Sequence, residues 1–216
     1  MTITIREPGS AITHFIGMML ALIASAPLLA KAALDAGRTG IFSMAVFMTS
    51  MILLYGASAL YHSVNLSGNR LKVFRKIDHM MIFVLIAGSY TPVCLLVLEP
   101  QSGYILLITV WAIAAAGILV KALWITCPKW FSSILYIALG WACLSVFGQL
   151  IDTLSKPAFF WLLFGGILYT TGGIIYALKL PVFNALHKNF GSHEIFHLFV
   201  MGGSICHFIC MYQYVI

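Results

Sequence analysis

The stretch HEIFHLFVMGGSICH, residues 193–207, heads an apolar run of membrane length and carries two histidines at its start. On an α-helix, residues four apart lie on one face, so His193 and His197 can bind a single metal ion. Read alone, the pattern H-E-x-x-H is the helix signature of zinc hydrolases. Ionisable groups at the edge of a membrane-length segment are costly and usually mark a site. The stretch therefore predicts a transmembrane helix that begins at a metal site.

The composition of the whole chain is that of an integral membrane protein. Of its 216 residues, 62% are hydrophobic and only 8% are charged, whereas a soluble domain averages about 25% charged residues. No long polar tract divides the chain, so residues 1–216 are expected to form a single membrane domain. The five cysteines are scattered and odd in number, which argues against a disulfide framework.

Seven apolar runs approach or exceed the roughly 20 residues that span a bilayer. They predict an all-α fold, a bundle of seven transmembrane helices joined by short polar or Pro/Gly-marked connections. Residues 1–10 contain Arg6, Glu7 and Pro8, and we interpret them as a cytoplasmic lead-in and not as a cleaved signal peptide. The runs cover residues 12–34, 40–62, 77–98, 103–124, 130–151, 157–179 and 193–215.

The distribution of lysine and arginine predicts the orientation. With the N-terminus inside, nine basic residues lie on the cytoplasmic side and three outside, which by the positive-inside rule places the C-terminus outside. The net charge of +6 is therefore explained by topology, and no nucleic-acid partner is expected. The inner residues are Arg6, Arg70, Lys72, Arg75, Lys76, Lys121, Lys129, Lys179 and Lys188, and the outer ones are Lys31, Arg38 and Lys156.

This orientation brings metal-type ligands from three helices to one depth. His62 ends the second run, Asp78 begins the third, and the two histidines of the HExxH pattern begin the seventh. Three imidazoles, those of His62, His193 and His197, would hold Zn²⁺ and leave a fourth position for water. Asp78 would then hold or deprotonate that water, and Ser58, one turn before His62, would add a hydrogen bond.

Each of these residues has a simpler interpretation. A histidine at a helix end is often only an interfacial polar residue, and Asp78 could pair with Arg75 or Lys76. His207 lies about 15 Å deeper than His197 along the helix, too far to share the ion, so it lines a cavity or bonds a neighbouring helix. Glu194 points away from the face of His193, and we interpret it as a residue favoured by the dipole at the helix start.

Taken together, these residues carry a resemblance. Ser58-x-x-x-His62, Ile77-Asp78-His79 with residues 88–92, and the H-E-x-x-H pattern resemble the hemolysin III family. This is the bacterial branch of the progestin and adiponectin receptor (PAQR) superfamily, related more distantly to the alkaline ceramidases. The resemblance covers essentially the whole chain, including Glu7, Thr13-His14 and Gly172-Gly173-x-x-Tyr176, although Ser10 stands where the family often has Asn.

The resemblance implies a seven-helix bundle with its N-terminus inside. It also implies zinc held by His62, His193 and His197, with Asp78 at the zinc-bound water and Ser58 nearby. Members of the family have been linked to ceramide hydrolysis, to membrane lipid and energy homeostasis, and to hemolysis.

We therefore expect a zinc-dependent hydrolase of lipid amides or esters in the bacterial inner membrane, acting in lipid homeostasis. Membrane lipids are the expected substrates or ligands, and the sequence leaves homo-oligomerisation open. Two alternatives stay open as well: a non-catalytic sensor or receptor with structural zinc, and a hemolysin-type cytolysin. Uniformly apolar helices without a polar lining disfavour the cytolysin.

The orientation can be tested by cysteine labelling. Single cysteines placed in residues 63–76 should react with an impermeant maleimide only from the cytoplasmic side, and those in residues 31–40 only from outside, because basic connections stay inside. Labelling in whole cells and in inverted vesicles measures this. Reaction of the 63–76 connection from outside would overturn the orientation.

Overall fold

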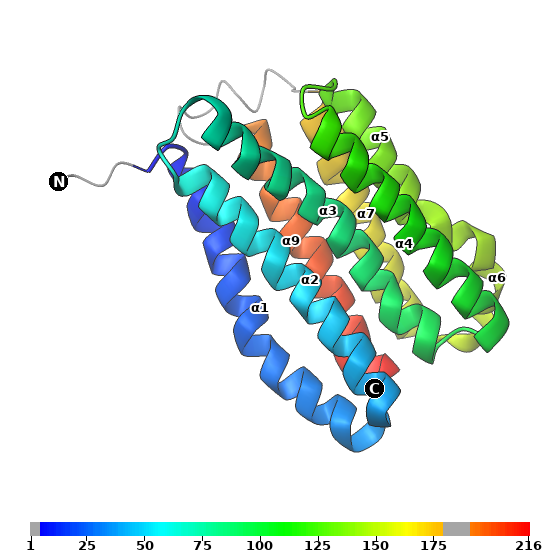
Figure 1. Cartoon of the computed structure of the whole chain (residues 1–216). Coiled ribbons are helices and arrows are strands. Elements are labelled where there is room, and N and C mark those ends of the chain that lie inside the picture. The colour runs from blue at the N-terminus through cyan, green and yellow to red at the C-terminus, as the bar shows by residue number, and fades with distance from the viewer. Residues whose placement is uncertain (1–4, 179–190) are drawn as a thin grey trace.

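The computed structural model describes residues 5–178 and 191–216, and within them it is all helical, without a strand (Figure 1). Seven spans are long and apolar enough to cross a membrane, which confirms the predicted number of transmembrane helices. The elements are α1 (Pro8–Asp35), α2 (Gly37–Ser63), α3 (Gly68–Leu96), α4 (Pro100–Leu123), α5 (Lys129–Gly140), a 3₁₀ turn (Trp141–Val146), α6 (Phe147–Thr153), α7 (Lys156–Leu178), α9 (Ser192–Cys210) and a final π turn (Met211–Val215).

The connection before α3 is much shorter than the sequence predicted. We expected a joint over residues 63–76, but α3 already begins at Gly68. Lysine and arginine are good helix formers, so the basic stretch continues the helix outside the apolar layer. Hydropathy marks where lipid ends and not where a helix ends, which is why the prediction was wrong. Asp78 consequently lies inside α3, several turns from its start.

The fifth span is interrupted, which the sequence did not predict. α5 ends at Gly140, and a 3₁₀ turn separates it from α6. A change of helix type leaves backbone groups without their usual partners. The Tyr90 hydroxyl of α3 satisfies two of them: it donates to the Gly140 carbonyl at 2.5 Å and accepts from the Cys143 N–H at 2.9 Å. α3 therefore holds the break in place.

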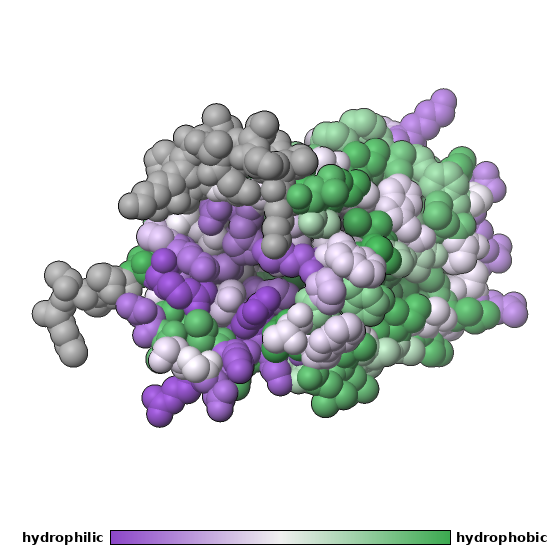
Figure 2. Space-filling model, turned by 90° about the horizontal axis from the view of Figure 1, so that it is seen from above, coloured by the Kyte–Doolittle hydropathy of each residue, from purple (hydrophilic) through white to green (hydrophobic). Residues whose placement is uncertain are grey.

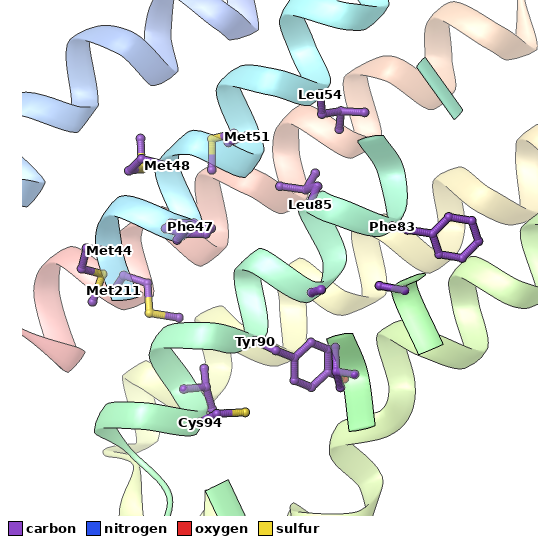
Figure 3. Close-up of a cluster of buried hydrophobic side chains, with 14 of the residues drawn as sticks. Met44, Phe47, Met48, Met51, Leu54, Phe83, Leu85, Tyr90, Cys94 and Met211 are labelled. Atoms are coloured by element: carbon purple, nitrogen blue, oxygen red, sulfur yellow. The ribbon is translucent and has the colours of Figure 1, made fainter. Parts of the chain in front are cut away.

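Close packing of the helices forms the core. Side chains of α2 and α3, including Met44, Phe47 and Phe83, form part of one buried cluster that Met211 joins from the C-terminal turn (Figure 3). α7 and α9 approach through small residues, because a methyl group on Gly203 would overlap the ring of Tyr169. Small residues of this kind let membrane helices approach one another closely.

His62, at the end of α2, and His193, at the start of α9, lie at the same end of the bundle (Figure 1). We call it the histidine end. The starts of α1, α3 and α5 and the end of α4 lie there too, and hydrophilic side chains gather over one half of this surface (Figure 2). Seven of the nine predicted inner basic residues belong to these segments; Lys179 and Lys188 lie outside the described residues.

Candidate metal centre

Three histidines converge at the histidine end, as the sequence predicted. His62 comes from the last turn of α2, and His193 and His197 come from the first two turns of α9. One ring nitrogen from each lies within 4.8 Å of the others, and His62 and His197 are fully buried. The tertiary structure therefore brings together residues that are far apart in the sequence. His193 and His62, whose ring nitrogens are in contact, are 131 positions apart.

The geometry of the ring nitrogens fits a metal ion. His193 Nε2 and His62 Nε2 are 3.2 Å apart, close to the about 3.3 Å expected between two nitrogens on a tetrahedral zinc ion with Zn–N bonds of 2.0–2.1 Å. Two imidazole lone pairs at this distance repel unless a proton or a cation lies between them. The buried histidine triad could therefore hold a metal ion.

Glu7 fixes the orientation of His62. Its carboxylate accepts a hydrogen bond from His62 Nδ1, and its backbone N–H donates to the His62 carbonyl at 3.0 Å. With the proton on Nδ1, the Nε2 lone pair is free for a metal. The hydrogen bond with His62 lowers the pKa of Glu7 to about 2; the charge of Arg6 acts in the same direction and partial burial opposes it.

His197 is oriented by α1 in a similar way. Its Nδ1 lies 3.3 Å from the Thr13 hydroxyl, which itself donates to the Gly9 carbonyl at 2.9 Å. Nδ1–H therefore donates to Thr13, and Nε2 is left for the metal. The His14 ring stacks on His197 with the ring centroids 3.6 Å apart and nearly parallel planes. His193 has no such support, since its buried Nδ1 makes no hydrogen bond among the described residues.

Asp78 and Ser58 line a cavity beside the triad. The cavity, about 170 Å³ in volume, is also lined by His193, His197 and His14, whereas His62 is not part of its lining. Both side chains are buried, and the Ser58 hydroxyl has no hydrogen-bond partner in the described part of the chain. The structure therefore brings together all five residues that the sequence singled out.

The local partner of Asp78 differs from the simpler interpretation of this residue. Its carboxylate lies 3.1 Å from Nδ1 of its neighbour His79 and is not paired with Arg75 or Lys76. The Lys76 ammonium instead donates to the carbonyl of Ala122 in α4. Asp78 thus faces the cavity from within α3, with His79 and not a lysine or arginine beside its carboxylate.

Glu194 has the structural role that the sequence predicted. One carboxylate oxygen accepts from the Gly191 N–H at 2.8 Å, at the start of α9, and the other accepts from the Ser10 hydroxyl at 2.5 Å. Both oxygens are therefore engaged away from the triad. Ser10, which stands where the family often has Asn, therefore connects α1 to α9.

His207 does not belong to the triad. Its Nε2 lies 3.2 Å from the Leu162 carbonyl of α7, and its ring meets Tyr169 edge to face. It also lines the cavity, so both of its predicted alternatives hold.

The roles of Glu7, Thr13 and His14 were not predicted from the sequence. The position of Glu7 directly before the first helix, on the predicted cytoplasmic side, indicated that it lies near the histidines. Its hydrogen-bond partner, His62, could be identified only in the folded chain.

Comparisons with known proteins agree over nearly the whole chain. A family model described as Haemolysin-III related matches residues 3–208. The chain is 37% identical over 212 residues to a Hemolysin-3 homolog from Bacillus subtilis (strain 168), covering 98% of this chain and 95% of that protein. It is 36% identical over 211 residues to Hemolysin-3 from Bacillus cereus, covering 98% and 92%. More distantly, it is 22% identical over 225 residues to the adiponectin receptor protein of Drosophila melanogaster, covering 94% of this chain and 49% of that protein.

The three histidines can be tested as metal ligands by substitution. Replacing His62, His193 or His197 with Ala should weaken metal binding by more than the 10–100-fold typical of losing an outer-shell partner, because each change removes a ligand. Metal analysis of the purified protein measures this. His207→Ala is the matched control, a buried histidine on the same helix that should retain the metal. Equal metal content in His197→Ala and the parent would refute the site.

A second prediction concerns Glu7. Glu7→Gln should lower metal affinity roughly 10–100-fold, because the charged acceptor that orients His62 is lost. Glu99→Gln is a matched control, since Glu99 also precedes a proline at a helix start but is exposed at the opposite end. Competition with a chelator of known affinity gives both values. Unchanged affinity in Glu7→Gln would show that the orienting bond is dispensable.

Proposed function

The chain belongs to the haemolysin-III related family, and from that premise we propose that it is a zinc-dependent hydrolase of membrane lipid amides or esters. One observation carries the proposal: a buried carboxylate, a hydroxyl without a partner and two histidines of the triad line one end of a cavity whose remaining wall is mostly apolar. Such a cavity suits a molecule with a polar linkage and a hydrocarbon chain.

His62, His193 and His197 are the proposed zinc ligands. Three imidazoles are a common catalytic zinc set, in which one position stays open. A bound zinc ion would supply Lewis-acid chemistry, polarising a carbonyl group and making water more acidic. The hydrogen bonds that His62 and His197 donate to Glu7 and Thr13 support the proposal, because they occupy Nδ1 of both rings and leave Nε2 for an ion.

Asp78 is the proposed general base. It is the carboxylate that faces the cavity, because the oxygens of Glu194 are engaged elsewhere. Its Oδ atom would take the proton of an attacking water and then deliver it to the leaving amine or alcohol. His79 lies beside the carboxylate and holds its position.

Ser58 is the proposed donor to the substrate carbonyl. A buried hydroxyl without a partner costs free energy, and a carbonyl oxygen in the cavity would accept its hydrogen bond. As charge develops on that oxygen in the transition state, the bond strengthens.

The apolar part of the cavity would hold an acyl chain. Its lining continues from the triad to residues of α3, α4, α6 and α7, among them Val93, Leu106, Leu150 and Phe159. Burial of each CH₂ group contributes about 0.8 kcal/mol, so a long chain is favoured over a short one. This wall also excludes water from the reacting groups.

The proposed setting is the bacterial inner membrane, with the histidine end toward the cytoplasm and a role in lipid homeostasis. The bacterial relatives and the seven apolar spans support this setting. The name hemolysin describes the Bacillus relatives and the name receptor describes the Drosophila relative, and each name corresponds to an alternative outcome of the test below.

Asp78→Asn separates an enzyme from a sensor. The change keeps the shape but removes the base, so zinc should be retained while hydrolysis falls roughly 10²–10⁴-fold. Fatty-acid release from ceramides and phospholipids, by protein in lipid nanodiscs, is the measurement. Asp152→Asn, at an exposed site in α6, is the matched control.

The other outcomes are equally informative. A parent that releases no fatty acid from any lipid but binds zinc and changes conformation with lipid composition is a sensor. A parent that lyses erythrocytes without releasing fatty acid is a cytolysin. Full activity in Asp78→Asn would remove Asp78 from the mechanism.

A further inference from the structure

A second buried polar cluster lies at the connection between α4 and α5. Lys121, in the last turn of α4, directs its ammonium group at Cys127 in the connection, with Nζ 3.1 Å from Sγ. The same ammonium group donates to the Ser132 hydroxyl of α5. Sγ and this hydroxyl are 3.3 Å apart, so the three groups form a closed triangle.

Lys121 is unusual because its side chain is only 1% exposed. A buried charge is costly unless it is paired with an opposite charge. All six acidic side chains of the protein belong to the described residues, and none forms an ion pair with Lys121 there; the recorded ion pairs involve only Glu7 and Asp78. The acidic residues are Glu7, Asp35, Asp78, Glu99, Asp152 and Glu194.

Among the groups that contact the Lys121 ammonium, the Cys127 thiol is the one that readily becomes an anion. A serine hydroxyl stays neutral, and the Tyr136 ring, 5.8 Å from Nζ, offers only its π-face. The Tyr136 hydroxyl is engaged in donating to the His79 carbonyl at 3.0 Å. Loss of the thiol proton therefore gives the buried ammonium its counter-ion.

Other groups around Cys127 favour the same state. Burial raises the pKa of the Cys127 thiol, but hydrogen bonds with Ser132 and Lys121, the Lys121 charge and the more distant Arg75 outweigh it, so the pKa is lowered. The start of α5, which directly follows, adds positive potential. The titratable and charged groups that face the sulfur are thus Arg75 from α3, Lys121 from α4, Tyr136 from α5 and Tyr176 from α7.

We propose that Lys121 and Cys127 form a buried ammonium–thiolate pair, and that Cys127 is a site of modification by small electrophiles, hydrogen peroxide in particular. This site is separate from the histidine triad and does not depend on the proposed hydrolase activity. In the triangle, the Ser132 hydroxyl donates its proton to the thiolate and the ammonium group donates to both partners.

The oxidation balances with peroxide as the only co-reactant. The thiolate sulfur attacks one peroxide oxygen, an S–O bond forms and the O–O bond breaks. Sulfur is oxidised by two electrons to the sulfenic acid, and hydroxide leaves and takes a proton from the solvent to become water. The Lys121 ammonium lies where it stabilises the charge on the departing oxygen.

The position of the sulfur limits which reagents reach it. Cys127 is 6% exposed, but its chain neighbours Thr126 and Pro128 are exposed, so the thiol lies just below the surface. Peroxide is hardly larger than water and fits such a position. Cys143 is more exposed than Cys127, and its sulfur donates to the Gly140 carbonyl at 3.8 Å. If exposure decided reactivity, Cys143 would react faster, whereas if thiolate formation decides it, Cys127 reacts faster.

The test measures how the alkylation rate of Cys127 by iodoacetamide depends on pH, with the full-length protein in nanodiscs and each cysteine followed by mass spectrometry. The midpoint of the profile reports thiolate formation, whereas the absolute rate also falls as a thiolate becomes less basic. In the parent, the midpoint should lie below the ordinary value of about 8.5. Lys121→Met should return it to that value or above.

Matched variants separate the pair from general charge effects. Lys121→Arg keeps a cation and should keep the low midpoint, while Lys156→Met removes an exposed lysine at the opposite end and should change nothing. Sulfenic acid at Cys127, trapped by a β-diketone after brief peroxide treatment at pH 6, should fall roughly fivefold in Lys121→Met. Thermal unfolding confirms that each variant is folded.

Two results would overturn the proposal: equal midpoints in the parent and Lys121→Met, or faster modification of Cys143 than of Cys127 in the parent. If Lys121→Met does not fold, the parent protein is compared with Cys127→Ser instead. Thiolate ultraviolet absorption at neutral pH that disappears in Cys127→Ser supports the pair, and its absence in the parent refutes it.

Discussion

The free-energy cost of burying polar groups in an apolar medium shapes the histidine end. In hydrocarbon, water cannot satisfy an unpaired donor or acceptor, and each such group costs several kcal/mol. This chain places four histidines, a carboxylate and a serine among membrane helices at one end. The three histidines of the triad have hydrogen-bond partners from another segment, so the bonds that offset their burial also join α2, α9 and the start of α1.

The first helix has an unexpectedly large part in this arrangement. Glu7, Ser10 and Thr13 lie on successive turns around the start of α1, and each contacts a different residue of the site: His62, Glu194 and His197. The spacing of about three residues keeps these side chains near one face of the helix. α1 therefore positions α2 and α9 relative to each other, although it contributes no ligand to the triad.

The two polar clusters at this end compensate for the burial of polar groups in different ways. The histidines are neutral nitrogen donors with lone pairs turned toward one point, an arrangement that a cation completes. Lys121 is already a cation, so its surroundings must supply an anion, and Cys127 is in contact with it. Tyr136 lies between the two regions, with its ring facing Lys121 and its hydroxyl on the backbone of His79, next to Asp78. The start of α5 thus packs against both clusters.

The sequence by itself determined the class of fold and singled out the three histidines of the triad. Hydropathy depends only on composition along the chain, so the seven spans could be counted, and the i, i+4 spacing of His193 and His197 follows from helix geometry alone. The ends of the helices were predicted less well than their number. α3 begins before the basic residues 70–76, which are compatible with a helix but not with the apolar layer of the membrane. The break after Gly140 could not be predicted, since it depends on a hydroxyl from Tyr90, which is 50 residues away. Likewise, only the tertiary structure could pair Glu7 with His62 and Lys121 with Cys127, because the partner of a buried polar group is set by which helices pack together.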